Sequence, residues 1–389
     1  MKKTSKITLA ILLALVISVF MSASLFAANG YNTNDGTDPS NPLSDTSSFT
    51  LTKNYTLAGD TTNGSSPAEN FTVTVTPYAI ANVPASANLT VDNMPTISNV
   101  TLAAATGAAD TDNTTAVTAT VTLPTYTAVG DYWYQIQETA GSTAGVTYDP
   151  NVYYLHVQVI HESNSFTNLI RLVTLHTAAP NADGTPAATG DTKNDGIAAN
   201  SYSNGSLAIE KVVTGNMGDE TKEYAVNVVF TYTSADNTNN PVKSVISYTD
   251  GTAKTIAPAA WTYASGAWTA SVDLVLSHQE TVTFTNIPYG VAYTVTETDY
   301  SDEGYTHTFA FADSDTNTDT VTAENTAWTD AAAAGTISDA SDELTITNDK
   351  SIPIDVGVIV ESAPFVVIAL AAACGLAIIL IKRKRATDR

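Results

Sequence analysis

Alternating runs of Thr, Val, Ile and Tyr recur along this sequence and leave little choice of secondary structure. Examples are "FTVTVTP" from Phe71, "YYLHVQVI" from Tyr153 and "TVTFTNIP" from Thr281. Period two places successive side chains on opposite faces of an extended strand. Clusters of Gly, Asn, Asp and Pro separate the runs, and the region between the two chain ends has no convincing helical periodicity. The sequence therefore predicts an all-β fold made of β-sandwiches.

An internal repeat divides this region into two halves. Each half begins with a strand that contains a lysine, continues with an aromatic-led strand and a Tyr-x-(Ile/Val)-x-Glu-Thr motif, and closes on a strand that ends in asparagine. The lysine and the glutamate are 85 residues apart in the first half and 86 in the second. The three polar residues are Lys53, Glu138 and Asn200 in the first half, and Lys211, Glu297 and Asn348 in the second. We expect two tandem domains, at 48–204 and 205–349.

Each lysine and glutamate shares its strand face with apolar residues, because residues at even offsets in a strand point the same way. Burying either charge costs several kcal/mol unless it is paired or neutralised. One interpretation is a buried salt bridge. The other is chemistry, since desolvation favours a neutral amine beside a carboxylic acid. The amine can then attack the asparagine side-chain carbonyl while the acid polarises that carbonyl and shuttles protons, which releases ammonia and leaves an amide cross-link.

The two ends of the chain predict export and anchoring. Residues 1–28 resemble a secretory signal peptide, with a basic start, an apolar run and small residues at the end. Residues 29–47 are polar and suit a flexible linker. Residues 363–381 form an uncharged apolar stretch long enough for a transmembrane helix, and the basic residues of 382–389 favour a cytoplasmic tail.

Charge and cysteine content limit the partners and the means of stabilisation. Between residues 29 and 381 there are eight basic residues, whereas all of the chain's 39 acidic residues except Asp388 lie there. Such a surface disfavours nucleic acid and anionic lipid, which need a basic footprint. Cys374 is the one cysteine of the chain and lies in the apolar stretch, so the exported region has no disulfide. A Lys-Asn bond would tie the first strand to the last in its place.

The stretch from Val129 to Val159, "VGDYWYQIQETAGSTAGVTYDPNVYYLHVQV", resembles the pilin isopeptide-linkage domain of Gram-positive surface proteins. The second half, with "GSLAIEKVVTGN", "YTVTETDYSDEGYT" and "LTITNDK", is similar to the domain that often follows it. The resemblance implies Ig-like sandwiches of the CnaB type, each with a self-generated bond promoted by a glutamate. The implied bonds are Lys53–Asn200, promoted by Glu138, and Lys211–Asn348, promoted by Glu297. Asn200 follows "IAA", where the family pattern has a bulkier Phe or Ile two places before the asparagine.

Residues 350–362 resemble a sorting signal, because "SIPIDVG" precedes the apolar stretch and the basic tail. The usual pattern is Leu-Pro-x-Thr-Gly, whereas this chain has Pro353, Asp355 and Gly357 with no threonine and one extra residue before the glycine. The resemblance implies a variant sortase that cuts before Gly357. The alternative is a single-pass membrane anchor. Lys193 is our candidate for linkage to another subunit, because it lies shortly before the closing strand of the first half, where related pilins carry their linking lysine; an ordinary solvated lysine is the other interpretation.

We thus expect a secreted, cell-surface structural protein, a pilin or stalk subunit, whose partners are sortase and either other pilin subunits or peptidoglycan. The competing class is a monomeric adhesin that presents a surface to a host or glycan ligand. A hydrolase that uses Glu138 or Glu297 as a general acid is disfavoured, since both lie on apolar faces, and no cofactor is expected. Residues from Asp313 to Glu324 alternate like calcium-loop ligands, but Thr318 replaces the required glycine, so we expect no metal.

Overall fold

The structure is a computed structural model, and it describes residues 43–79, 94–103, 114–162, 167–194, 196–250, 255–256, 260–311, 320–322 and 332–353. In this part of the chain the regular elements are strands, apart from one short 3-10 turn, η3 (Ser301–Glu303). The predicted all-β fold is confirmed. The strands before the middle of the chain are β1 (Ser48–Gly59), β2 (Asn70–Pro77), β3 (Val100–Ala103), β4 (Thr114–Thr122), β5 (Gly130–Thr139), β6 (Val146–Thr147), β7 (Val152–His161), β8 (Leu169–His176) and β9 (Lys193–Asn194).

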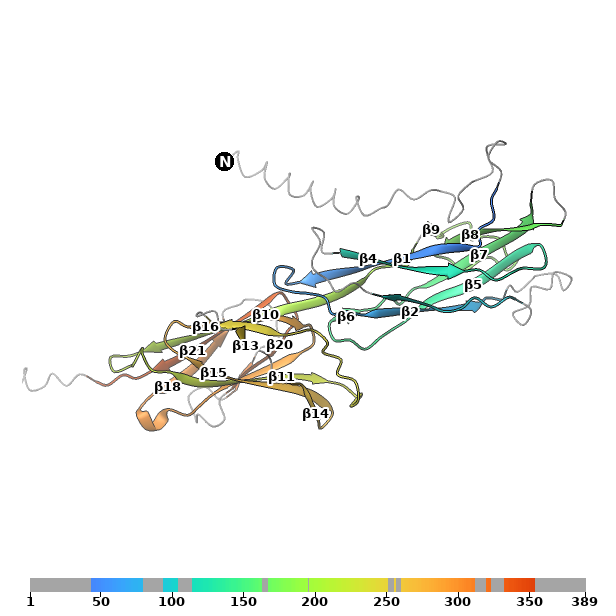
Figure 1. The fold of residues 1–389 in the computed structure, drawn as a ribbon. Helices are drawn as coiled ribbons and strands as arrows, with labels where there is room; N and C mark the ends of the chain where they lie inside the picture. Colours follow the sequence, from blue (N-terminus) through green and yellow to red (C-terminus); the bar gives the residue numbers. More distant parts are fainter. Residues whose placement is uncertain are drawn as a thin grey trace, which may run out of the picture.

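A long strand, β10 (Asn200–Thr214), leads into the second half of the chain. The strands that follow it are β11 (Tyr224–Thr233), β12 (Ser247–Asp250), β13 (Thr255–Ile256), β14 (Thr262–Ala264), β15 (Ala267–Leu276), β16 (Thr281–Pro288), β17 (Ala292–Glu297), β18 (Thr306–Phe311), β19 (Thr320–Thr322), β20 (Ala332–Thr336) and β21 (Ser341–Asp349). Figure 1 shows the two groups of strands as two lobes arranged end to end, with β10 between them.

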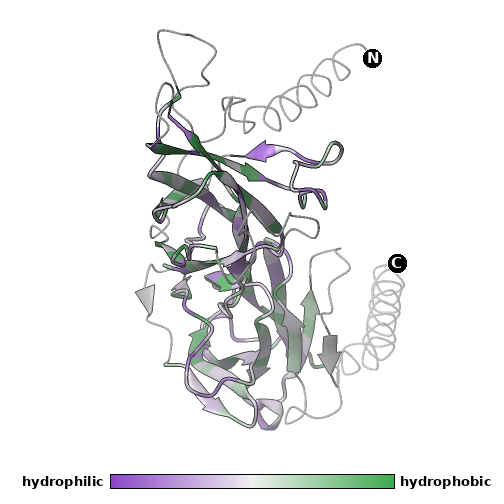
Figure 2. Ribbon diagram, turned by 90° about the vertical axis from the view of Figure 1, so that its right-hand side faces the viewer, coloured by the Kyte–Doolittle hydropathy of each residue, from purple (hydrophilic) through white to green (hydrophobic). Residues whose placement is uncertain are grey.

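Two sandwiches form because each sheet has one apolar face. In the first sandwich, the sheet β3-β2-β5-β7-β8-β9 packs against β1 and β4, and one buried cluster includes Leu51 and Val121 from one layer and Val73 and Ile136 from the other. In the second, the sheet β14-β15-β11-β17-β20-β19 packs against β10, β16 and β21 around a separate cluster. Hydrophobic and hydrophilic residues alternate along the strands, as Figure 2 shows.

Strand β10 belongs to both sandwiches. Its first residues pair in parallel with β1 and antiparallel with β6, and its later residues pair antiparallel with β16 and in parallel with β21. One sheet of nine strands therefore runs through both lobes. The boundary that we predicted at 204/205 falls inside this strand.

Further contacts hold the lobes together where β10 crosses. Gly59 has φ +80° and packs so closely that a Cβ atom there would lie 1.9 Å from the carbonyl oxygen of Asn204. Asn286 accepts hydrogen bonds from the backbone N–H of Ser65 at 3.1 Å and from the hydroxyl of Tyr202 at 3.3 Å. The two lobes are thus joined by a shared strand and by direct contacts beside it.

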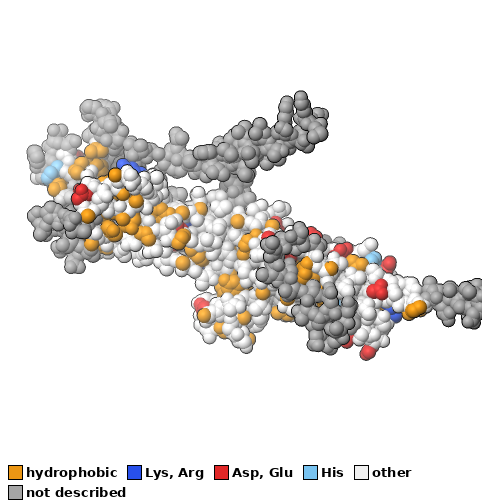
Figure 3. Space-filling view, turned by 180° about the vertical axis from the view of Figure 1, so that it is seen from behind, with side chains coloured by type: hydrophobic (Ala, Val, Ile, Leu, Met, Phe, Trp, Pro, Cys, Tyr) orange, Lys and Arg blue, Asp and Glu red, His pale blue; other side chains and the backbone are white. Residues whose placement is uncertain are grey.

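The surface carries few charges for its size. On the face in Figure 3 the described residues show few charged side chains among the backbone and the uncharged ones, and acidic groups are more frequent than basic ones. This agrees with the low content of Lys and Arg between the two chain ends.

Several predictions concern residues outside the described ranges. They are the signal peptide at 1–28, most of the linker at 29–47, Asp355 and Gly357 of the sorting signal, the apolar stretch at 363–381, the tail at 382–389 and most of the acidic segment from Asp313 to Glu324. Within the described ranges no helix has the length and hydropathy that crossing a membrane requires.

Candidate cross-linking sites

The parallel ladders of β10 bring each predicted lysine next to its asparagine. In the first sandwich Tyr55 of β1 lies opposite Asn200 of β10, and Lys53 precedes Tyr55 by two residues. In the second sandwich Val213 of β10 lies opposite Asn348 of β21, and Lys211 precedes Val213 by two residues. The lysine and the asparagine therefore share one face of neighbouring strands in both sandwiches.

The glutamates come from the facing sheets. Glu138 on β5 lies opposite Val73 of β2, and Glu297 on β17 lies opposite Val226 of β11. Two residues before these valines stand Phe71 and Tyr224, the aromatic residues of the predicted repeat. The ring centroid of Phe71 is 5.9 Å from Lys53 Nζ, and that of Tyr224 is 4.7 Å from Lys211 Nζ.

At the first site Glu138 contacts both other residues of the predicted triad. Lys53 Nζ is 3.1 Å from Glu138 Oε2, and both side chains are 0% exposed. Asn200 donates from Nδ2 to Glu138 Oε1 at 2.7 Å. Lys53 Nζ also donates to the carbonyl oxygen of Ala198 at 2.5 Å. The carboxylate thus bridges the lysine amine and the amide nitrogen of the asparagine.

A fourth residue at the first site, Asp149, was missed by the sequence reasoning. Its backbone N–H donates to Asn200 Oδ1 at 2.8 Å and to Glu138 Oε2 at 2.9 Å. Its carboxylate accepts from the hydroxyl of Tyr153 at 2.8 Å and from the backbone N–H of Ala198 at 3.1 Å. The signal in the sequence was the turn "YDPN" just before a strand, which marks a loop but not its direction.

The second site repeats the triad without such a donor. Lys211 Nζ is 2.8 Å from Glu297 Oε1, with side chains 0% and 1% exposed, and Asn348 donates from Nδ2 to the same oxygen at 3.1 Å. Among the described residues, Glu297 Oε2 and Asn348 Oδ1 are buried without a hydrogen-bond partner. His307 of β18 lies opposite Asn348 in the sheet.

Burial shifts the pKa of both lysines and of Glu297 toward the neutral form of each side chain. Desolvation lowers the pKa of Lys53, although the nearby charge of Glu138 opposes the shift. Desolvation also lowers the pKa of Lys211, to about 8, and raises the pKa of Glu297, with the opposite charge of the partner opposing each shift. A neutral amine is the nucleophilic form of lysine, so the environment favours attack on a carbonyl.

One contact of the glutamates differs from our expectation. We expected the glutamate to polarise the asparagine carbonyl, but in both sites the carboxylate contacts the amide nitrogen. At the first site the orientation of the amide is fixed, because a flipped Asn200 would turn its NH₂ group against the N–H of Asp149, donor against donor. The glutamate is therefore placed to carry protons between the two nitrogens.

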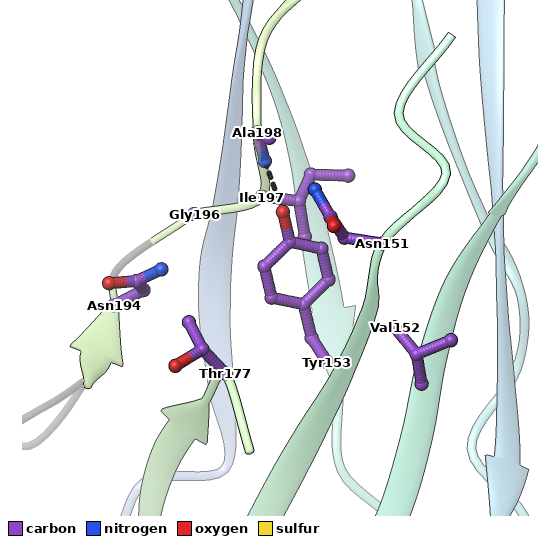
Figure 4. A pocket seen from close by; sticks show the side chains of 8 residues that line it. All are labelled: Asn151, Val152, Tyr153, Thr177, Asn194, Gly196, Ile197 and Ala198. Carbon is purple, nitrogen blue, oxygen red and sulfur yellow. Dashed lines mark hydrogen bonds between the residues drawn. The ribbon is translucent and has the colours of Figure 1, made fainter. Parts of the chain in front are cut away.

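Lys193 lies at the edge of the first sandwich, away from both triads. It is exposed in β9, opposite His176 of β8. A pocket of about 320 Å³ adjoins this edge and is lined by Asn151, Val152, Tyr153, Thr177, Asn194, Gly196, Ile197 and Ala198. In Figure 4 the hydroxyl of Tyr153 points to the backbone N–H of Ala198, so one wall of the pocket is also part of the first site.

Pro353, the first predicted residue of the sorting signal, is exposed at the end of the described chain. It follows β21 by four residues, so the signal would begin close to the second site. Within the described ranges there is no group of three or more His, Cys, Asp or Glu side chains that could hold a metal ion.

Comparison with known families assigns both halves of the chain. Residues 49–200 match the Spy0128-like isopeptide containing domain, and residues 205–350 match a domain of unknown function, DUF7601. A pilin of Streptococcus pyogenes serotype M1 is 24% identical over 267 residues, which are 67% of this chain and 70% of that protein. The predicted likeness to Gram-positive pilin isopeptide-domain proteins is confirmed.

Two solved structures are also similar to this chain. The crystal structure of the major pilin from Streptococcus pyogenes is 18% identical, with 79% of this chain and 99% of that chain covered at a TM-score of 0.47. The major pilin protein T-13 from the same species is also 18% identical, with 78% and 97% covered at a TM-score of 0.45.

Proposed function

We propose that this chain is a structural subunit of a Gram-positive surface pilus or stalk, stapled by two self-generated isopeptide bonds, Lys53–Asn200 and Lys211–Asn348. The observation that carries the proposal is the pair of buried Lys-Glu-Asn triads, at the same register and within contact distance in both sandwiches. The match to an isopeptide containing domain and to a pilin supports it. The chain is not an enzyme, since each bond forms once without turnover.

The proposed chemistry follows from the contacts. The neutral amine of the lysine attacks Cγ of the asparagine, a C–N bond forms, and the bond from Cγ to Nδ2 breaks. The glutamate touches both nitrogens, so it takes a proton from the attacking nitrogen and gives one to the departing nitrogen, which leaves as ammonia. The buried lysine amine and the asparagine amide are then replaced by one neutral amide that links the strands irreversibly, and the glutamate ends in the form in which it started.

We expect the intact mass of the recombinant exported region to fall short of the sequence mass by two ammonia molecules. Glu297→Ala should lose one ammonia fewer, and so should Glu138→Ala, because each removes the proton carrier of a single site. Peptide mapping should find the remaining link in the other sandwich. Full sequence mass in the folded wild-type protein would refute the cross-links.

We further propose that a sortase cuts before Gly357 and joins the chain either to peptidoglycan or to another subunit. The exposed position of Lys193, at the edge strand of the first sandwich, supports its role as the acceptor amine. The order of the apolar stretch and the basic tail in the sequence supports sorting at the outer face of the cytoplasmic membrane.

Replacing the acceptor should abolish polymers. In wall extracts of the native host, we expect ladders that resist SDS for wild type and a single band for Lys193→Arg, because the guanidinium keeps the charge but is not an acylation nucleophile at neutral pH. Lys243→Arg is the matched control, since Lys243 is half-exposed and paired to Glu69 at 3.1 Å. Ladders that persist in Lys193→Arg would exclude this lysine. A single wild-type band would favour the monomeric adhesin.

A further inference from the structure

The two cross-linking sites differ in what faces the asparagine carbonyl. The tetrahedral intermediate of an acyl transfer places negative charge on that oxygen, and a fixed N–H donor stabilises it. At the first site the donor is the backbone N–H of Asp149, 2.8 Å from Asn200 Oδ1. At the second site Asn348 Oδ1 is buried without a partner among the described residues.

The sheet topology explains the difference. In the first sandwich, β6 pairs with β10 only as far as Ser201 opposite Thr147, and the chain then leaves the sheet. The next residues turn inward, so the N–H of Asp149 points at the site rather than along a ladder. In the second sandwich, β18 pairs with β21 through His307 opposite Asn348, and the ladder continues on both sides of that pair. Among the described residues no backbone N–H turns out of this ladder to reach Asn348 Oδ1.

The carboxylate of Asp149 holds its own N–H in place. Its Oδ1 accepts from the backbone N–H of Asn151 at 2.9 Å, which closes an Asx turn, and from the Asn151 side chain at 2.7 Å. Its Oδ2 accepts from Tyr153 and from the backbone of Ala198. Ala198 is also the residue whose carbonyl binds Lys53 Nζ. Asp149 therefore links the loop that carries the donor to the residue that binds the amine of Lys53.

We propose that Asp149 forms an oxyanion hole for cross-linking in the first sandwich, with its backbone N–H as the donor and its carboxylate and Tyr153 as positioning groups. The proposal rests on the isopeptide chemistry proposed above. During attack by Lys53 Nζ on Cγ of Asn200, the electron pair of the carbonyl moves to Oδ1, where the N–H holds it. The pair returns when the Cγ–Nδ2 bond breaks and ammonia leaves with the proton from Glu138. The second sandwich reacts without this donor.

The test follows ammonia loss in each sandwich of the full exported region. The chain is made by cell-free translation, samples are quenched in acid at intervals, and peptide mapping separates the two bonds. Two replacements are compared at position 149. Asp149→Ala removes the positioning carboxylate. Malic acid, delivered on a suppressor tRNA, keeps that carboxylate but replaces the backbone N–H with an ester oxygen.

We expect malic acid at position 149 to slow bond formation in the first sandwich by about 10²-fold, the usual cost of losing one oxyanion donor. Asp149→Ala should also slow it, because the backbone N–H loses the carboxylate that positions it. The second sandwich of the same molecules should keep its wild-type rate. Tyr153→Phe should slow the first bond less, since Asn151 and Ala198 still hold the carboxylate. Malic acid at Asp183 is the matched control, because Asp183 closes a similar but exposed Asx turn in the same sandwich.

The proposal would be overturned if the first bond forms at the wild-type rate with malic acid at position 149, even where Asp149→Ala reacts slowly. The role of Asp149 would then be to stabilise the fold and not to stabilise the oxyanion. A slow malic acid chain supports it, whether or not the alanine variant folds. If wild type itself loses no ammonia in either sandwich, the proposed function fails instead, so the two failures are distinct.

Discussion

Pulled between residue 193 and its C-terminal end, the Asn348→Ala chain should lengthen by about 45 nm, the contour length of the released segment at roughly 3.3 Å or more per residue. The Asn200→Ala chain should not lengthen in this way. Each variant removes one of the two proposed cross-links and keeps the lysine and glutamate of that site. The contrast between them comes from the position of each bond along the line of force.

The line of force follows from the shared strand. From Lys193 the chain runs a short distance to β10 and along it to Lys211, where the proposed bond leads directly to Asn348 at the end of β21. The second bond therefore bypasses all residues between 211 and 348. The first bond lies outside this path, because it joins β10 to Lys53 of β1, and neither β1 nor the rest of the first sandwich lies between residue 193 and the C-terminal end. It would carry load only if force entered through the N-terminal end.

Single-molecule force spectroscopy can test both directions of loading. The exported region has no cysteine, so Lys193→Cys provides a unique handle, with the second handle after Pro353. When the first handle is moved to Ser47→Cys, the Asn200→Ala chain should lengthen as well, because the segment from 53 to 200 is then released. A wild-type chain that extends from the 193 handle as far as Asn348→Ala would contradict the second bond.

The faces of the site residues could be predicted from the sequence, but their partners could not. Period-two alternation placed Lys53 and Glu138 on apolar faces, because that inference needs only the geometry of one strand. The parallel pairing of β1 with β10 joins residues almost 150 positions apart, and no local pattern sets such a register. The internal repeat still identified the members of each site, since Lys, Glu and Asn occur in the same order in both halves.

Neither the role of Asp149 nor the continuity of β10 through both sandwiches could be predicted, and the reason differs from that for the strand partners. "YDPN" is a strong turn signal, but whether an N–H in a turn meets water or a buried asparagine depends on where the neighbouring strand ends. The domain boundary was placed at 204/205 because both repeats appear complete there. A single strand of 15 residues that closes one sandwich and opens the next satisfies both repeats without a linker.

Loss of the second cross-link should also lower stability. We expect Asn348→Ala to reduce the free energy of unfolding of the second sandwich by about 5 kcal/mol, the value that chain entropy gives for a link closing a loop of well over 100 residues. For a unit of this size the loss corresponds to roughly 15 °C in Tm. Asn237→Ala is the matched control, since Asn237 is exposed in a bend of the same sandwich and should shift Tm little.

The same variant should acquire a pH dependence that the bonded protein lacks. Without the bond the Lys211 amine remains, and burial lowers its pKa to about 8, below its value in an unfolded chain. Between pH 8 and about 10.5 the unfolded state then binds more protons than the folded state, so the stability of the variant rises with pH. In wild type the proposed bond would turn this amine into an amide, which cannot titrate. Urea unfolding should therefore find that the difference in free energy of unfolding between wild type and Asn348→Ala decreases by roughly 3 kcal/mol across this pH range. A constant difference would mean that Lys211 carries a titratable amine in both proteins.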